Sequence, residues 1–255
     1  MKVVILAGGF GTRISEETIN IPKPMIEIGG RPILWHIIKI YTHYGFKDFI
    51  IALGYKSDYI KKFFLDTINF SGDIKIEFKD GVKNVLCNET DDINLELIDT
   101  GINTNTGGRL KFLKNYLDET FLFTYGDGLA DINIKNLLDF HKKNKKLVTV
   151  TAVHPPARFG SIIIKNDLVE EFSEKPIRGE GLINGGFMVF EPRALNFIDS
   201  LEDSLESILL EKLSKKNELC GFLHNGFWQC MDTKRDKDTL EQLWTQGNPP
   251  WKVWK

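Results

Sequence analysis

The chain has 255 residues, 27% of them charged, and a formal net charge of -2. This length suits one large α/β domain or two small ones. The near-neutral charge gives no global basic field for nucleic acid, so we expect no nucleic-acid partner, and local cations must hold any polyanionic ligand. No stretch approaches the roughly 20 apolar residues of a membrane span, so we expect no membrane partner.

The cysteines indicate a reducing compartment. Cys87, Cys220 and Cys230 lack the spacing of metal ligands, and their odd number argues against a disulfide framework. The apolar run near the N-terminus covers only about six residues and lacks the cleavage pattern of a signal peptide. We therefore expect a cytoplasmic protein.

The first 25 residues carry the strongest functional signal. An apolar run over residues 3–6 predicts a buried strand, which leads into a glycine cluster at Gly8, Gly9 and Gly11. Small residues at a strand end let phosphate groups approach the main-chain N–H donors. The loop lacks the closing Gly-Lys-Ser/Thr of a Walker loop and the third glycine of a dinucleotide fingerprint. A purely structural turn is therefore the alternative.

Two cations follow this loop. Arg13 comes directly after it, and Lys23 lies between Pro22 and Pro24, which restrict the backbone on both sides. A guanidinium fork and an ammonium beside a glycine loop would hold a polyphosphate. The alternatives are an exposed surface cation for Arg13 and a solvated loop tip for Lys23.

Strand-like and helix-like segments then alternate along the chain. We predict a helix over 32–44 that stops at Gly45, a buried strand over 48–53, and a polar flap over 79–105. The remaining predicted elements are a helix over 57–64, strands over 74–78 and 95–98, a helix from residue 106, a strand over 121–125, a helix over 133–144, a strand over 147–153, a hairpin with strands over 161–164 and 168–172, a strand over 183–190 and two helices over 193–216.

This alternation predicts an α/β fold with a mostly parallel central sheet covered on both faces. Ligands of such sheets bind beyond the carboxyl ends of the strands. The glycine loop and the turn formed by Gly126, Asp127 and Gly128 both follow predicted strand ends. We therefore expect them to line one pocket.

Two carboxylates are candidates for holding a metal. Asp127 lies between two glycines, where packing is a poor explanation, and Asp232 follows an apolar segment and precedes a helix. Mg²⁺ is usually held by one or two carboxylates together with substrate phosphates. The alternatives are a turn residue for Asp127 and a helix N-cap for Asp232, which spacing alone favours. Asp131 is a rival ligand, but it reads as the cap of the helix that starts near Asn133.

Two further motifs could bind a sugar phosphate. Glu174 and Lys175 end the second strand of the hairpin, where Lys175 could bind a phosphate or serve only solubility. Asn184 and Gly185 begin a strand at which small residues would admit a sugar ring, while the Asn184 amide could bond its hydroxyls. A β-bulge is the alternative at this second motif. The histidines show no triad or zinc spacing, and no serine nucleophile elbow is present.

Taken together, these motifs resemble the signature of the sugar-1-phosphate nucleotidyltransferases over essentially the whole chain. The signature is carried by Leu6-Ala-Gly-Gly-Phe-Gly-Thr-Arg, Pro22-Lys-Pro-Met, Gly126-Asp-Gly, Glu174-Lys-Pro and Asn184-Gly-Gly. Longer stretches resemble the branch of that family that uses CTP: Ile33-Leu-Trp-His-Ile, Asp99-Thr-Gly, Thr106-Gly-Gly-Arg-Leu, Phe123-Thr-Tyr-Gly-Asp-Gly, Arg158-Phe-Gly, Gly226-Phe-Trp-Gln-Cys-Met-Asp-Thr and Pro249-Pro-Trp-Lys. Residues 79–94 match least well, and Cys230 stands where that branch has a proline.

The resemblance implies a Rossmann-like three-layer nucleotidyltransferase fold with a small β-hairpin or flap region. It implies a single domain over residues 1–255, with a nucleotide-binding part over about 1–130 and a sugar-phosphate-binding part over about 131–255. The implied reaction converts CTP and α-D-glucose 1-phosphate to CDP-glucose and pyrophosphate with Mg²⁺. Related enzymes supply dideoxysugar synthesis for surface polysaccharides.

The same resemblance implies a role for each matching residue. Arg13 and Lys23 would be catalytic and bind the nucleotide phosphates, and Asp127 and Asp232 would hold the metal. The other implied nucleotide-binding residues are Leu6, Ala7, Gly8, Gly9, Phe10, Gly11, Thr12, Thr104, Arg109 and Gly126. The implied sugar-phosphate-binding residues are Glu174, Lys175, Asn184 and Gly185.

Base and sugar choice stay open. Cytosine presents two adjacent acceptors, so a paired donor such as Arg109 would fit it and oppose uracil and thymine. Arg109 lies near a predicted helix start and could instead bind a phosphate or a flap carboxylate. An enzyme that uses UTP or dTTP with another sugar 1-phosphate and a non-catalytic nucleotide-sugar sensor are the alternative functions. The aromatic tail and the resemblance together predict a homo-oligomer.

Overall fold

A computed structural model describes residues 1–70, 75–79, 82–86, 93–156, 161–173 and 181–254 of the chain. Its elements, in chain order, are β1 (Lys2–Leu6), η1 (Thr12–Ile14), α1 (Ser15–Thr18), η2 (Lys23–Met25), β2 (Glu27–Ile28), β3 (Arg31–Pro32), α2 (Ile33–His43), β4 (Asp48–Leu53), α3 (Ser57–Phe70), β5 (Lys75–Lys79), β6 (Val82–Leu86), β7 (Asn94–Asp99), α4 (Thr106–Phe112), η3 (Leu113–Tyr116), β8 (Phe121–Tyr125), β9 (Gly128–Ala130), α5 (Ile134–Asn144), β10 (Val148–Val153), β11 (Ser161–Lys165), β12 (Leu168–Ser173), β13 (Ile183–Phe190), η4 (Pro192–Phe197), η5 (Leu205–Leu210), α6 (Glu211–Lys215), β14 (Leu219–His224), β15 (Trp228–Cys230) and α7 (Lys234–Thr245).

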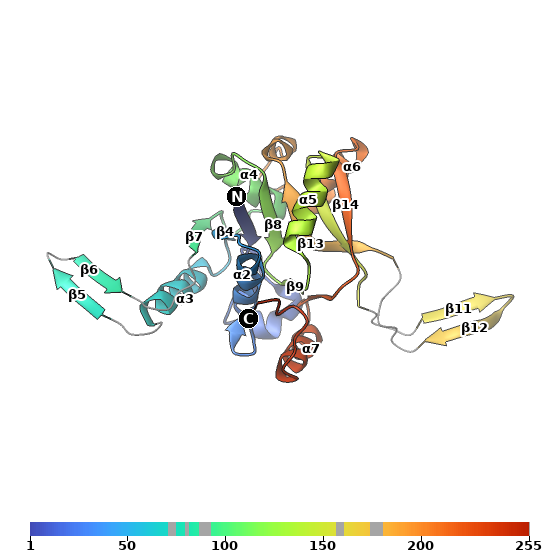
Figure 1. Cartoon of the computed structure of the whole chain (residues 1–255), viewed down its shortest axis with the longest axis horizontal. Helices are drawn as coiled ribbons and strands as arrows, with labels where there is room; N and C mark the ends of the chain where they lie inside the picture. The colour runs from blue at the N-terminus through green and yellow to red at the C-terminus, as the bar shows by residue number, and fades with distance from the viewer. Residues whose placement is uncertain (71–74, 80–81, 87–92, 157–160, 174–180, 255) are drawn as a thin grey trace.

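A seven-stranded sheet with the order β14-β10-β13-β8-β1-β4-β7 forms the centre of the molecule (Figure 1). β1 pairs in parallel with β4 and β8, β4 pairs in parallel with β7, and β10 pairs in parallel with β14. Within this sheet β13 is antiparallel to both of its neighbours, β8 and β10. The predicted mostly parallel α/β sheet is therefore confirmed.

The sheet is covered on both faces. Successive residues of β1 point to opposite sides, so that Val3 and Ile5 join one apolar cluster while Val4 and Leu6 join the other. The first cluster includes α2, α5 and α7 residues, and the second includes α4, η5 and α6 residues. The sheet thus lies between two layers of helices, as the three-layer fold predicts.

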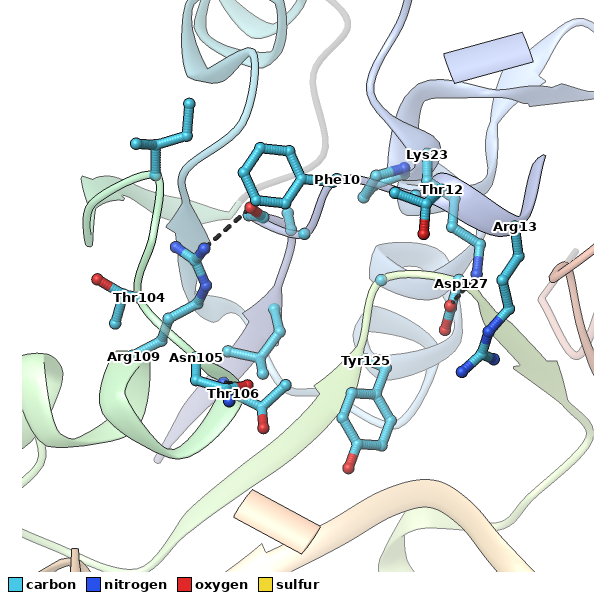
Figure 2. A pocket seen from close by; sticks show the side chains of 18 of the residues that line it. Phe10, Thr12, Arg13, Lys23, Thr104, Asn105, Thr106, Arg109, Tyr125 and Asp127 are labelled. Atoms are coloured by element: carbon cyan, nitrogen blue, oxygen red, sulfur yellow. Dashed lines mark hydrogen bonds and ion pairs between the residues drawn. The ribbon is translucent and has the colours of Figure 1, made fainter. Parts of the chain in front are cut away.

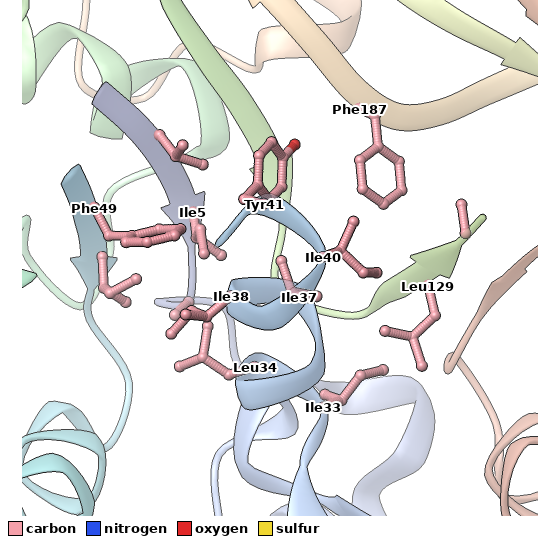
Figure 3. Packing of buried hydrophobic residues seen from close by; sticks show 14 of the residues in the cluster. Ile5, Ile33, Leu34, Ile37, Ile38, Ile40, Tyr41, Phe49, Leu129 and Phe187 are labelled. Carbon is pink, nitrogen blue, oxygen red and sulfur yellow. The ribbon is translucent and has the colours of Figure 1, made fainter. Parts of the chain in front are cut away.

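Helix α2 shows how the sequence pattern builds this packing. Its apolar residues recur at helical spacing, and Figure 3 shows Leu34, Ile38 and Tyr41 lying against the sheet residues Ile5 and Phe49. The helix ends at His43 with Tyr44 as its C-cap, and Gly45 then adopts a φ of 89°, which is a conformation that favours glycine. The predicted helix over 32–44 is confirmed.

The C-terminal tail packs back onto α2 instead of standing free. Trp251 is fully buried, and its indole nitrogen lies 3.4 Å from Nδ1 of the buried His36. The other ring nitrogen of His36, Nε2, lies 2.8 Å from the carbonyl oxygen of Ile28, which requires the proton on Nε2. The aromatic tail is therefore part of the core of this chain, and the homo-oligomer stays a prediction.

The predicted hairpin over 161–172 is also confirmed. β11 and β12 pair antiparallel, and the turn residues Asn166 and Asp167 have φ values of 49° and 63°. Such positive values at both central residues suit Asn and Asp better than most other side chains. β5, which matches the strand predicted over 74–78, pairs antiparallel with β6, which lies within the segment that we predicted as a flap.

Two local predictions, and the N-cap alternative for Asp232, were wrong. Asn133, not Asp131, caps α5, because its side chain accepts the Asn136 N–H, while Asp131 pairs with His224 at 2.9 Å. Thr233, not Asp232, is the N-cap of α7. The two helices predicted over 193–216 are instead a 3₁₀-helix (η4), a π-helical turn (η5) and the short α6.

The structure offers no helix, among the residues described, that is both long and apolar enough to cross a membrane. The sheet draws β1, β4, β7 and β8 from the predicted nucleotide-binding part and β10, β13 and β14 from the predicted sugar-phosphate-binding part. The single-domain assignment remains a prediction.

Candidate active site

The main cavity lies at the carboxyl ends of the central strands and has a volume of about 570 Å³. The glycine loop after β1, the turn after β8 and the segment after β7 all contribute to its wall. Figure 2 shows Arg109 and Thr104 at one end of this cavity and Lys23, Arg13 and Asp127 at the other. Its size and its place at the strand ends are typical of a ligand site.

Glycines in this wall are required by close approaches. A Cβ on Gly8 would lie 2.3 Å from the Arg109 guanidinium, and one on Gly126 would lie 2.6 Å from the carbonyl oxygen of Leu6. Gly11 has a φ of 65°, which larger residues adopt only with strain. These glycines therefore let the Arg109 guanidinium and the end of β1 lie close to the loops that surround the cavity.

At the charged end of the cavity, two carboxylates converge on one ammonium. Lys23 Nζ lies 2.5 Å from Asp127 Oδ2 and 2.6 Å from Asp232 Oδ1. Arg13 adds a second cation, with its Nη1 at 2.8 Å from Asp232 Oδ2. The side chain of Lys23 is 12% exposed, whereas that of Arg13 is 77% exposed. The cluster thus contains one largely buried cation, Lys23, and one largely exposed cation, Arg13.

The protonation states follow from this pairing. Burial by itself would lower the pKa of Lys23, but Asp127 and Asp232 outweigh burial and raise that pKa above its usual value. Burial by itself would raise the pKa of Asp232, but Lys23 and Arg13 hold it below the usual range. The lysine is therefore an ammonium and Asp232 is a carboxylate at neutral pH.

At the other end of the cavity, the Arg109 guanidinium is buried and hydrogen-bonded to protein groups. Its Nη1 donates to the carbonyl oxygens of Leu53 and Gly101 and to the Thr100 hydroxyl, and its Nη2 donates to the Gly8 carbonyl oxygen at 2.9 Å. Burial lowers the pKa of this arginine, and Asp99 partly offsets that effect. Arg109 therefore ties together the loops that follow β1, β4 and β7.

A second cavity of about 480 Å³ adjoins the first. The two share Arg13, Tyr125, Asp127 and Asp232. The wall of the second also includes residues of β13 and β15, among them Asn184, Gly185 and Trp228, and Glu206 of η5. We predicted one pocket, and the structure has two adjoining cavities with the charged cluster at their junction. Such a pair of cavities can hold two ligands whose reacting groups meet at the cluster.

Each predicted nucleotide-binding residue that we named lines the first cavity, as do both predicted metal ligands. Asn184 and Gly185 line the second cavity, and the register of β10 and β13 shifts between Val150 and Ala152, so the bulge alternative also holds here. Glu174 and Lys175 lie outside the described residues. The roles assigned to all of these residues remain predictions.

Sequence reasoning assigned no role to several residues of the wall. Tyr125 lies between the two cavities, and Trp228 donates from its indole nitrogen to the Gly185 carbonyl oxygen at 2.7 Å. Tyr125 directly precedes Gly126 and Asp127, so its place beside that motif was the available signal. Nothing in the sequence around Glu206 marks it as a second-cavity residue.

The charged cluster fits a divalent cation held jointly with substrate. Asp127 and Asp232 already share one cation, the Lys23 ammonium, through one oxygen each. No cluster of three or more His, Cys, Asp or Glu side chains suited to a metal occurs in the described part of the chain. Two carboxylates completed by phosphate oxygens are a usual way for proteins to hold Mg²⁺.

The sequence matches the nucleotidyl transferase family over residues 2–242. The chain belongs to this family. The chain is 50% identical over 258 residues to the glucose-1-phosphate cytidylyltransferase of Salmonella typhimurium, with 100% of each chain covered. The glucose-1-phosphate cytidylyltransferase of Salmonella typhi is also 50% identical, again over 100% of both chains.

A solved structure gives the nucleotidyltransferase fold independent support. HddC from Yersinia pseudotuberculosis, crystallised in complex with GMP-PN, superposes with a TM-score of 0.70. The two chains are 23% identical, and the superposition covers 95% of this chain and 99% of that one. At this identity the likeness concerns the fold.

Proposed function

We propose that this protein transfers the cytidylyl group of CTP to glucose 1-phosphate, which forms CDP-glucose and pyrophosphate. The observation that carries the proposal is the cluster of Lys23, Arg13, Asp127 and Asp232 at the junction of two cavities. The full-length 50% identity to the Salmonella typhimurium cytidylyltransferase supports the choice of substrates.

The chemistry needs positioning more than proton transfer. The oxygen of glucose 1-phosphate that attacks the α-phosphorus is already ionised, so no strong general base is required. As the new P–O bond forms, the bond to the pyrophosphate breaks and its electron pair leaves with the pyrophosphate. The barrier lies in bringing two polyanions together and in stabilising charge on the leaving group.

The two cations of the cluster suit these tasks. Lys23 is held as a point charge between carboxylates, and on nucleotide binding it would exchange them for phosphate oxygens. Arg13 is largely exposed, and its planar fork can follow the triphosphate and pair with two oxygens at once. The glycine loop would carry the phosphates close to the main chain.

Asp127 and Asp232 would hold Mg²⁺, which would supply electrostatic stabilisation of the phosphate charge. The convergence of both carboxylates on one cation supports this assignment. In the absence of nucleotide, Lys23 supplies the positive charge that keeps the two carboxylates together.

A pyrophosphate-release assay tests the proposal. The wild-type protein is given CTP, UTP, dTTP, ATP or GTP with glucose 1-phosphate, and then CTP with other hexose 1-phosphates, with Mg²⁺ present. We expect the highest kcat/KM with CTP and glucose 1-phosphate. Product formation should be lost when EDTA is added to chelate the free metal. Preference for UTP or dTTP would assign a different substrate pair, and nucleotide binding without turnover would assign a sensor.

Cellular location and assembly follow as parts of this proposal. Nucleoside triphosphates and hexose phosphates are metabolites of the cytoplasm, and Cys220 and Cys230 are free thiols, which suits a reducing compartment. We also infer a homo-oligomer. Light scattering coupled to size-exclusion chromatography measures its mass directly, and a monomer would overturn that part.

A further inference from the structure

One more carboxylate lies in the wall of the second cavity. Glu206, in the first turn of η5, accepts a hydrogen bond of 2.5 Å on Oε1 from the Tyr125 hydroxyl. Its Oε2 accepts hydrogen bonds from the hydroxyls of Ser204 at 2.7 Å and Thr106 at 2.9 Å. Hydroxyl groups from three separate segments of the chain thus converge on one carboxylate.

Tyr125 continues this network toward β13. Its hydroxyl also takes part in a hydrogen bond with the Asn184 side chain, whose Oδ1 accepts the Gly186 N–H at 2.9 Å. Gly186 has a φ of 83°, and a Cβ there would lie 2.7 Å from the Tyr125 ring. The position of Tyr125 is therefore restricted twice: its ring packs closely against Gly186, and its hydroxyl is hydrogen-bonded.

The geometry fixes the direction of each hydrogen bond. Burial opposes ionisation of Glu206, but hydrogen bonds from Tyr125, Ser204 and Thr106 hold its pKa below the usual range. The Tyr125 hydroxyl donates to Glu206 Oε1. Asn184 Oδ1 already accepts the Gly186 N–H, so the NH₂ group is the part of the Asn184 amide that faces the Tyr125 hydroxyl.

We propose that Glu206 is a positioning residue of the hexose pocket. Its carboxylate fixes the Tyr125 hydroxyl, and through that hydroxyl the Asn184 amide, in the orientation that contacts the hexose hydroxyls. The inference rests on the proposed function, because it takes the second cavity as the place of the hexose ring. Glu206 thereby acts on recognition of the sugar phosphate and not on the phosphate-binding cluster.

Two conservative variants test this role. Glu206→Gln keeps the size of the side chain, but any orientation of its amide sets an NH₂ donor against at least one hydroxyl donor. Tyr125→Phe keeps the ring and removes only the hydroxyl. Steady-state kinetics with CTP and glucose 1-phosphate, and with the epimer galactose 1-phosphate, give KM and kcat for each variant, and thermal unfolding verifies that each is folded.

We expect each variant to raise the KM for glucose 1-phosphate about tenfold, since a hydrogen bond to a charged group is lost. The KM for CTP should stay within twofold, and the preference for glucose 1-phosphate over galactose 1-phosphate should narrow. The double variant should resemble the single ones, because both changes remove the same contact. If Glu206→Gln does not fold, Tyr125→Phe gives the same KM comparison.

Glu211→Gln is the matched control. Glu211 begins α6, only five positions further along the chain, is 62% exposed and pairs with Lys215 at 3.9 Å. This variant should leave both KM values unchanged. The same chemical change is thus made on a neighbouring helix, away from both cavities.

Three results would overturn the inference. They are an unchanged KM for glucose 1-phosphate in both variants, an equal rise in the KM for CTP, and effects that add fully in the double variant. These results are distinct from failure of the proposed function, because they require an active wild-type protein. If the wild-type protein forms no CDP-glucose, the proposed function is wrong and the inference is overturned with it.

Discussion

The two ends of the main cavity each present an arginine, and the two arginines differ in almost every physical respect. The Arg13 side chain is 77% exposed and pairs with a carboxylate that Lys23 also holds. Arg109 is 4% exposed and donates to main-chain carbonyl oxygens and a hydroxyl from three loops. Figure 2 shows them at opposite ends of one cavity.

This difference separates a group that is available to a ligand from a group that builds the site. An exposed guanidinium can exchange a carboxylate for a phosphate with little change in desolvation. A buried guanidinium that satisfies several carbonyl oxygens cannot leave them without exposing unpaired acceptors. The charged end therefore suits catalysis, and the Arg109 end holds the glycine loop in shape.

The largest effect that we expect is on stability, from Arg109→Met. The substitution removes the guanidinium hydrogen bonds to the Leu53, Gly101 and Gly8 carbonyl oxygens and leaves the Gly101 oxygen without its donor, so it should lower the free energy of unfolding by about 3 kcal/mol. Urea denaturation measures this. Arg13→Met is the matched control and should change stability by less than about 0.5 kcal/mol. Equal losses of stability in the two variants would mean that Arg109 does not support the fold more than Arg13 does.

The same Arg109 variant, if enough remains folded, also tests base recognition. If the guanidinium contacts cytosine, the preference for CTP over UTP should fall together with stability. An unaltered preference would eliminate the cytosine role and leave Arg109 as a structural tie. The comparison uses the kcat/KM ratio for the two nucleotides, which does not depend on the fraction of folded enzyme.

The next largest effect concerns Lys23. Lys23→Ala should lower kcat by about 100-fold or more, as when one electrostatic stabiliser of a transition state is removed. Lys237→Ala is the control, because Lys237 also forms a short ion pair, with Glu17 at 2.8 Å, but lies outside both cavities. The control should retain turnover within twofold. Unchanged turnover in Lys23→Ala would reject the catalytic role.

A smaller effect is expected at Arg13. Arg13→Ala should lower kcat/KM about tenfold, and Arg13→Lys should recover part of this loss, since it restores the charge but not the fork. Both variants should unfold at the temperature of the wild-type protein, because the side chain is mostly exposed. A matching loss of stability would mean that Arg13, like Arg109, supports the architecture.

The last effect lies outside the cavity and concerns the dependence of stability on pH. Burial lowers the pKa of His36 to about 4, with partial compensation by hydrogen bonds to Ile28 and Arg31. Between pH 6.5 and 4 the unfolded chain therefore binds more protons than the folded one, so the free energy of unfolding falls as pH falls, by at most about 1.4 kcal/mol per pH unit. Urea denaturation across this range measures the slope.

His36→Gln should flatten that slope. Above about pH 5 Asp232→Asn should not flatten the slope, because Asp232 is ionised in both the folded and the unfolded chain there and its lowered pKa matters only at lower pH. An unchanged slope in His36→Gln would place the acid sensitivity elsewhere. The pH experiment thus separates the stability that is lost on acidification because of His36 in the core from the stability that is lost because of the charged cluster.

Local sequence patterns were sufficient for most of the framework. Apolar runs predicted the strands near residues 3–6, 48–53 and 183–190, and the β-branched runs on either side of Asn166 and Asp167 predicted the hairpin. Helix ends were harder, because several residues near each end can serve as the cap. Asp131 was assigned in this way, whereas in the fold it faces His224 on a different segment.

The sequence by itself determined the class of fold, the glycine loop and which cations and carboxylates could meet, because spacing and strand ends are local properties. Only the tertiary structure decided that Arg109 is tied to three loops, that the cleft divides into two cavities, and that Glu206 reaches Tyr125 across 81 positions of sequence. These features depend on which strand ends become neighbours in the sheet. Patterns of residue types along the sequence do not show which strands become neighbours.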